Sequence, residues 1–217
     1  MSSFTHLRSL GVALVTLTVL GSAQAALYKG VEFPQGLSSF ADVVVSYDPV
    51  IKSGQPTVGN RNSADTVGAP NFTGQSSQHA SLGDGGSITL EFIDNRLTGS
   101  GDTKKDLWIF EVGPDVEDTF VEISKNGSVW TPVGKVFGST AGIDIDAYGF
   151  GVTDQFRFVR LTDDGNEGDQ SGASVGADID AVGAIFSVKA PIPEPQTYLL
   201  MLSGLALVGA CARRRKV

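Results

Sequence analysis

The 217-residue chain carries 24 acidic and 16 basic side chains, which gives it a formal net charge of −8. An acidic surface repels phosphate groups, so the composition argues against nucleic acid or an anionic membrane surface as a partner. The single cysteine, Cys211, lies close to the C-terminus, so no disulfide within the chain can stabilise its fold.

The first 25 residues have the pattern of a secretory signal peptide. His6 and Arg8 make the start weakly basic, residues 10–20 form an apolar run, and Ala23-Gln24-Ala25 has the small-x-small form of a signal peptidase site. We expect export through the general secretion machinery and cleavage after Ala25. A retained N-terminal helix is the alternative, but the apolar run is too short to span a membrane.

Residues 26–190 are predicted to form one all-β domain. Short β-branched and aromatic runs recur between Gly, Asp, Asn and Pro clusters, and no long stretch has apolar residues at helical spacing. The predicted strands are residues 43–47, 88–92, 107–112, 119–124, 129–133, 155–162 and 179–188. Seven or more short strands favour a two-sheet antiparallel, jelly-roll-like sandwich. Residues 107–112 are apolar on both faces and indicate a central strand, whereas residues 50–81 are expected to form long surface loops.

Asn126-Gly127 predicts a two-residue hairpin turn, because both turn positions need a positive φ. The surrounding sequence VEISKNGSVWTPV (121–133) resembles a hairpin of discoidin-like, galactose-binding-type β-sandwiches, and FRFVRL (156–161) resembles a later strand of that fold. The resemblance implies an eight-stranded jelly roll whose relatives bind sugars, lipids or proteins through end loops, several with a structural calcium. No ligand-contact residue of those relatives can be matched here. We expect Trp130 to pack on the core.

Clustered acids are the main chemical signal in this domain. One cluster follows a predicted strand, a second lies within the last strand, and Asp144 and Asp146 form a third. The predicted metal ligands are Asp163, Asp164, Asn166, Glu167, Asp169, Asp178 and Asp180. Calcium prefers six to eight oxygen ligands, so these residues predict a calcium site, although the EF-hand pattern is not met. The alternative is a solvated acidic loop beside a strand edge.

Exposed aromatic rings would identify a sugar-binding module, because flat rings stack on the apolar faces of sugars. The glycines on both sides of Phe150 predict an exposed turn, so Tyr148 and Phe150 are the preferred ligand-binding candidates, ahead of Phe72 and Phe137. His79 stands alone in a polar segment and is expected to be exposed to solvent. No nucleophile motif or zinc-ligand set occurs, so the sequence predicts a protein without enzymatic activity.

The C-terminal residues 191–217 have the form of a sorting signal. Pro193-Glu194-Pro195 breaks the chain, residues 199–212 are apolar, and Arg213, Arg214, Arg215 and Lys216 form a basic end. This order resembles the PEP-CTERM tail of exported bacterial proteins. The resemblance implies a transmembrane helix that anchors the chain briefly in the inner membrane, cleavage by an exosortase-type membrane protease, and delivery to the cell surface or extracellular matrix. An anchor that is never cut is the alternative.

Without the two terminal segments the domain keeps 11 of the 16 basic and 23 of the 24 acidic residues, a net charge of −12. The sequence therefore predicts an exported β-sandwich that associates with exopolysaccharide or other matrix components, with calcium as its only candidate cofactor. A purely structural, self-associating surface protein is the first alternative. A glycan-active hydrolase is the second, since two suitably spaced carboxylates suffice for that chemistry.

Overall fold

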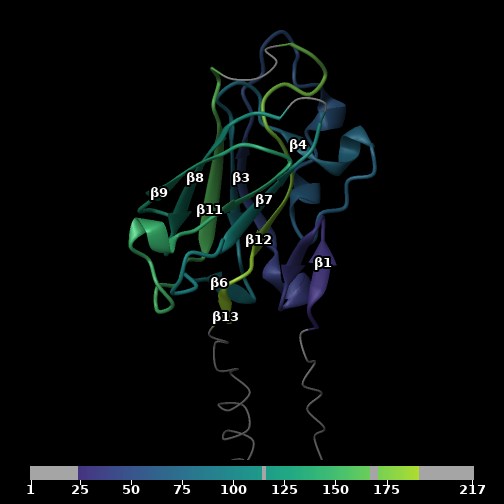
Figure 1. Cartoon of the computed structure of the whole chain (residues 1–217). Helices are drawn as coiled ribbons and strands as arrows, with labels where there is room; N and C mark the ends of the chain where they lie inside the picture. The colour runs from purple at the N-terminus through teal and green to yellow at the C-terminus, as the bar shows by residue number, and fades with distance from the viewer. Residues whose placement is uncertain (1–23, 114–115, 167–170, 191–217) are drawn as a thin grey trace, which may run out of the picture.

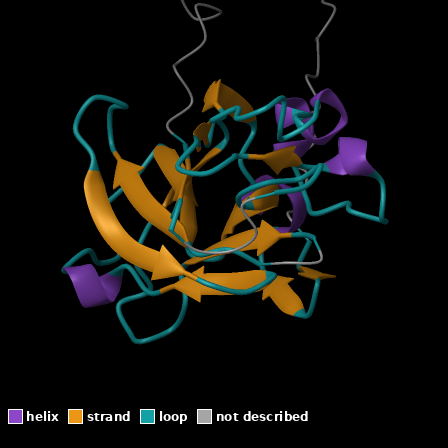
Figure 2. Ribbon diagram, turned by 90° about the horizontal axis from the view of Figure 1, so that it is seen from above, coloured by secondary structure: helices purple, strands orange, loops and turns teal. Residues whose placement is uncertain are grey.

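The structure is a computed structural model that describes residues 24–113, 116–166 and 171–190. Within these ranges the regular structure consists of short strands and single turns of 3₁₀ helix, with no α-helix. Figure 2 shows the strands stacked in layers, with the helical turns at the periphery. The all-β prediction is confirmed. The predicted signal helix and C-terminal membrane helix lie outside the described residues.

Two antiparallel sheets form the sandwich, and free edge strands keep either sheet from closing into a barrel (Figure 1). The larger sheet has the order β3 (Val43–Asp48), β5 (Ser87–Glu91), β11 (Phe158–Asp163), β8 (Thr119–Ser124) and β9 (Thr131–Val136). The smaller sheet has the order β10 (Thr140–Ile143), β7 (Leu107–Glu111), β12 (Asp178–Ala184) and β4 (Ala80–Ser81).

Two ribbons and five 3₁₀ turns complete the fold. The ribbons pair β1 (Ala26–Tyr28) with β2 (Val31–Phe33), and β6 (Asn95–Leu97) with β13 (Ser187–Lys189). The turns are η1 (Gly36–Ser39), η2 (Val58–Asn60), η3 (Ser63–Thr66), η4 (Ser76–Gln78) and η5 (Asp146–Tyr148). In Figure 1, β1 and β13 lie at the same end of the sandwich, so the described chain begins and ends there.

The main core follows from the two-residue period of the strands, which sends alternate side chains between the sheets. Ile88 and Leu90 of β5 lie beside Leu161 and Val159 of β11, and all four side chains are fully buried. Leu107 and Ile109 of β7 meet them from the smaller sheet. The expectation that residues 107–112 form a central strand is confirmed, because β7 pairs with both β10 and β12.

The N-terminal ribbon covers the outer face of the smaller sheet with a second apolar cluster. Phe33 and Phe40 stack with ring centroids 4.6 Å apart, and each packs against Phe110 of β7. Gly183 of β12 lies beneath them, where a Cβ atom would stand 2.6 Å from Phe33 and 2.9 Å from Phe40. Glycine at this position therefore lets the two rings rest directly on the sheet.

Several expected details differ in the structure. The β8–β9 hairpin forms, but its loop spans residues 125–130 because the Asn126 side chain accepts the amides of Ser128 (2.9 Å) and Val129 (3.0 Å), so the two-residue turn is wrong. Residues 50–81 were expected to form surface loops only, but they also contain η2, η3, η4 and β4. The last predicted strand divides into β12 and β13, which join different sheets.

The cluster under the N-terminal ribbon yields a stability prediction. Phe33→Ala removes a fully buried ring, so we expect it to lower the free energy of unfolding by about 3–5 kcal/mol, as truncation of buried aromatics does. Urea denaturation measures the change. Leu37→Ala is the control: that side chain is 70% exposed, and its loss should cost less than about 0.5 kcal/mol. Equal unfolding midpoints for the two variants would show that the ribbon does not stabilise the sandwich.

Candidate functional site

A pocket of about 220 Å³ opens where β7 ends, between the outer face of the smaller sheet and the loop that carries Phe72. Its lining combines aromatic rings, carboxyl groups, an amine and residues with hydroxyl groups. The residues that matter below are Lys29, Phe72, Phe110, Glu111, Thr140 and Asp180. They come from five separate segments of the chain, so only the folded domain brings them together.

Asp180 is rigidly held in this pocket. Its carboxylate accepts the backbone amides of Asn71 (3.1 Å) and Phe72 (3.4 Å), which ties the Phe72 loop to β12. Burial raises the pKa of Asp180, whereas these amides and the positive charge of Lys29 lower it. The Lys29 amine donates to the Phe72 carbonyl at 3.4 Å. A carboxylate and an amine thus both contact the backbone of one aromatic residue.

Glu111 adds a carboxyl group that keeps its proton. It is 4% exposed, and burial is the largest cause that raises its pKa well above the usual 4.5; a hydrogen bond to the Glu117 side chain and the charges of Glu117 and Asp178 raise the pKa further. The Glu117 amide donates to Glu111 at 3.1 Å, which partly offsets this rise. The proton of Glu111 is directed to the Glu117 side chain, and the carboxyl keeps acceptor capacity.

His79 is buried, which overturns the expectation that it is exposed. Its side chain is packed edge-on against Phe72, with ring centroids 5.6 Å apart, and neither ring nitrogen has a hydrogen-bond partner among the described residues. Burial lowers the pKa of His79 and raises that of Asp178 to about 7. Nε2 of His79 lies 3.7 Å from the Asp178 carboxylate, which accepts the Ser81 hydroxyl. The histidine thus supports the wall behind Phe72.

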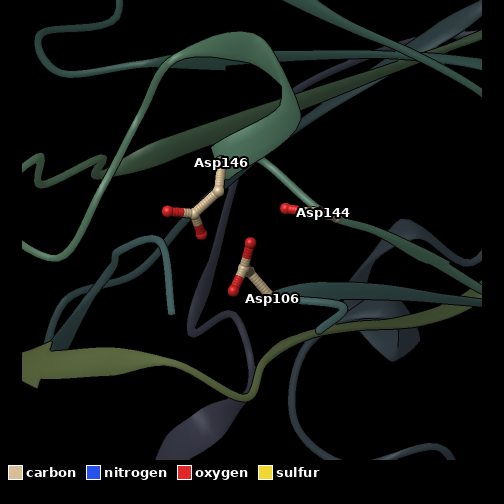
Figure 3. Close-up of side chains that lie close together, drawn as sticks. All are labelled: Asp106, Asp144 and Asp146. Atoms are coloured by element: carbon tan, nitrogen blue, oxygen red, sulfur yellow. The ribbon is translucent and has the colours of Figure 1, made fainter. Parts of the chain in front are cut away.

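A second polar group lies at the other end of β7. Asp106 precedes β7, Asp144 follows β10 and Asp146 begins η5, and one carboxylate oxygen from each lies within 4.8 Å of the others. Figure 3 shows the three side chains converging from separate segments of the chain. Among the described residues this is the one set of three or more acidic, histidine or cysteine side chains close enough to share a metal ion. We call it the acidic triad.

The predicted calcium ligands have other partners in the structure. Asp163 accepts the amides of Gly85 (2.8 Å) and Ala177 (2.9 Å), and Asp164 accepts the Lys135 amine at 3.0 Å. Asn166 donates both its backbone amide (3.3 Å) and its side-chain amide (3.1 Å) to Asp164. Glu167 and Asp169 lie outside the described residues. Asp178 and Asp180 bond to different groups, as described above. Calcium binding by this set stays a prediction.

The aromatic candidates also separate in the structure. Phe150 packs against the core with its ring 4.9 Å from that of Phe156, so the expected exposed platform is wrong for this residue. Tyr148 is 48% exposed and Phe137 71%. Trp130, expected in the core, instead lies outside it under Arg160, whose guanidinium carbon is 4.4 Å from the ring centroid. Glu122 of β8 pairs with that Arg160, and the group covers the outer face of the larger sheet.

Sequence reasoning missed Lys29, Glu111 and Asp106 as site residues. Asp106 and Glu111 stand at the two ends of the apolar segment Leu-Trp-Ile-Phe. An acid at each end of a strand that is apolar on both faces was the signal that could have found them. A carboxyl group at the end of such a strand is held in place, because moving it would disturb the pairing of the buried strand. Lys29 carried no such signal, because its place over β12 depends on how the N-terminal ribbon folds back.

Comparison with known proteins identifies the C-terminal segment. Residues 191–216 match the PEP-CTERM protein-sorting motif. The chain therefore carries a PEP-CTERM sorting signal. PEP-CTERM proteins are exported, processed by exosortase and sorted to the cell surface, and the expected address of this protein is confirmed to that extent. No described helix is long and apolar enough to cross a membrane, and the apolar part of the motif lies outside the described residues.

The other comparisons concern the domain. No curated protein matches the sequence. Among solved structures, the domain is similar to the carbohydrate-binding module CpGH89CBM32-6 of Clostridium perfringens, with 13% sequence identity and a TM-score of 0.33. The similarity covers 70% of this chain and 94% of the module.

The buried carboxyls predict how stability depends on pH. Glu111 and Asp178 hold protons in the folded state that the unfolded chain releases near pH 4.5 and 3.8, so folding binds protons and stability falls as pH rises. We expect the melting temperature to decline from about pH 5 to pH 8. Glu111→Gln keeps a neutral donor and should flatten this decline. Glu32→Gln, at an exposed position, is the control. Equal slopes for all three proteins would contradict the assignment.

Proposed function

We propose that the mature protein is a carbohydrate-binding module of the cell surface or extracellular matrix, and that the pocket at the end of β7 holds one sugar unit of an exopolysaccharide. The observation that carries the proposal is the composition of the pocket, whose lining combines a half-buried ring, Phe72, with Asp180 and Lys29. A sugar presents apolar C–H faces and a rim of hydroxyl groups, and this lining matches both.

Each wall of the pocket has a separate role in the proposal. The Phe72 ring packs on the apolar face of the sugar, as aromatic rings do against apolar surfaces. Asp180 keeps free lone pairs after accepting two amides, so it can accept sugar hydroxyls. Lys29 can donate to sugar oxygens, and the Glu111 carboxyl can accept from a sugar hydroxyl. Because His79 packs behind Phe72, the ring is supported from the rear before the ligand arrives.

The size of the pocket limits the ligand. Its volume of about 220 Å³ is below the roughly 300–1,000 Å³ of sites that enclose a drug-sized molecule. It therefore suits a single ring or a chain end, with the remainder of the polysaccharide outside. Such a shallow, single-unit site favours weak binding that gains strength when many copies of the protein meet one polymer.

Binding measurements test the proposal. Isothermal titration with monosaccharides and with the matrix polysaccharide of the producing strain should detect binding by the wild-type protein. Phe72→Ala should weaken it about tenfold or more, equivalent to at least about 1.4 kcal/mol. Phe137→Ala is the matched control, because it removes an exposed phenylalanine that does not line the pocket. Loss of binding in the Phe137 variant alone would place the site elsewhere.

The same samples distinguish the alternatives. New reducing ends in the polysaccharide would identify a hydrolase and assign Glu111 and Asp180 as its candidate carboxyl pair. Binding to no sugar, together with reversible oligomers in sedimentation experiments, would favour a structural protein that associates with itself. Either result would overturn the proposed function.

Processing of the sorting signal gives a second prediction. Replacing Pro193, Glu194 and Pro195 together by alanine should stop exosortase cleavage, because the protease acts at this part of the motif. The uncut protein should then accumulate in the membrane fraction at a higher mass on immunoblots. Gln196→Ala, next to the motif tripeptide, is the control and should be released as the wild type is. Normal release of the triple variant would contradict exosortase processing at this position.

A further inference from the structure

We propose that the acidic triad, Asp106, Asp144 and Asp146, binds a calcium ion. The triad lies at the opposite end of β7 from the sugar pocket, because Asp106 precedes Leu107 whereas the pocket begins at Phe110. The inference is therefore independent of the proposed function.

Strand pairing forces two of these carboxylates together. Leu107 of β7 pairs with Ile143 of β10, so the next residues outward, Asp106 and Asp144, are brought opposite one another at the end of the ladder. The Asp106 amide donates to the Ile143 carbonyl at 2.8 Å, which continues the pairing. Like charges placed directly opposite destabilise a strand pair. A cation between them would convert that repulsion into attraction.

Asp106 supplies the observation that separates this cluster from ordinary surface acids. Its side chain is fully buried. Oδ2 accepts the Ile145 amide at 2.8 Å, and the Ser100 hydroxyl lies close enough to lower the pKa of the carboxyl. Oδ1 makes no hydrogen bond of ordinary geometry among the described residues. Figure 3 shows the Asp106 carboxylate directed toward the other two acids. A buried carboxylate oxygen without a partner is costly, and a bound cation would satisfy it.

The surrounding backbone also fixes the position of the Asp146 carboxylate. The amides of Ser100 (2.8 Å) and Gly101 (3.1 Å) donate to its carboxylate. Gly99 allows this loop to approach, because a Cβ atom there would stand 2.7 Å from Asp146 Oδ2 and would also collide with the Phe150 carbonyl oxygen. The site is thus preorganised on two sides, by β7 with β10 and by the loop of residues 99–101.

The donor set selects calcium. All three side chains offer oxygen, and the cluster contains no histidine or cysteine, which excludes the preferred ligands of zinc. Calcium–oxygen distances of about 2.3–2.6 Å allow ligand oxygens on opposite sides of the ion to be about 4.6–5.2 Å apart. The three carboxylate oxygens lie within 4.8 Å of one another, and magnesium is bound by one or two carboxylates with several waters rather than by a cluster of three protein carboxylates. Asp144 and Asp146 are partly exposed, so water can complete the coordination.

Thermal unfolding of the exported protein, purified after secretion, tests the site with calcium chloride, magnesium chloride or EDTA. We expect a dissociation constant of about 10⁻⁴–10⁻³ M, typical of extracellular calcium modules. A hundredfold excess of calcium over that constant should raise the melting temperature by about 5–10 °C, and magnesium should raise it less. Identical curves in calcium and in EDTA would overturn the proposal.

Variants locate the ion. Asp106→Asn should lose the calcium response and, in EDTA, melt at or above the wild-type temperature, because one of three repelling charges is gone. Should that buried variant fail to fold, Asp144→Asn, at a partly exposed position, should likewise lose the response. Asp164→Asn is the matched control: it lies in the other acidic cluster, paired with Lys135, and should keep the response. Loss of the response in Asp164→Asn with retention in Asp106→Asn and Asp144→Asn would place calcium at the other cluster and overturn the proposal.

Discussion

Strand β7 is the constraint on which the rest of the structure depends. It is paired on both edges and buried on both faces, with Ile109 in the main core and Phe110 under the N-terminal ribbon. A slip of one residue would exchange these two sets of side chains, so the register is strongly specified. The residues at its ends, Asp106 and Glu111, are consequently held in fixed places, and each becomes part of a candidate site.

The buried carboxyls of the described domain differ in how their charge is compensated. Asp163 and Asp180 each accept two backbone amides, Asp178 accepts a hydroxyl, and Glu111 keeps its proton. Asp106 accepts one amide and has an oxygen left over. Because a buried charge must be neutralised or bonded, the least compensated carboxylate is the one that points to a missing ligand. The same reasoning separates the acidic triad from the clusters that are already satisfied.

Export and stability are connected in this protein. Residues 26–190 contain no cysteine and carry a net charge of −12, so the domain depends on its apolar core rather than on disulfides. A cation bound only by the folded domain would stabilise it after export. The pocket and the acidic triad lie at opposite ends of β7, so the two proposed sites do not overlap.

The sequence by itself determined the features that depend on local order. The sorting signal is an uninterrupted series of residue types, and the alternation of Ile88, Leu90 and Phe92 sufficed for a strand, because side-chain period and burial are properties of neighbouring residues. The tertiary structure alone decided which distant residues meet. It buried His79, moved Trp130 out of the core, and joined Asp106 to Asp144 and Asp146. Each of these outcomes depends on strand pairing between segments far apart in the chain, and composition and spacing carry no information about that pairing.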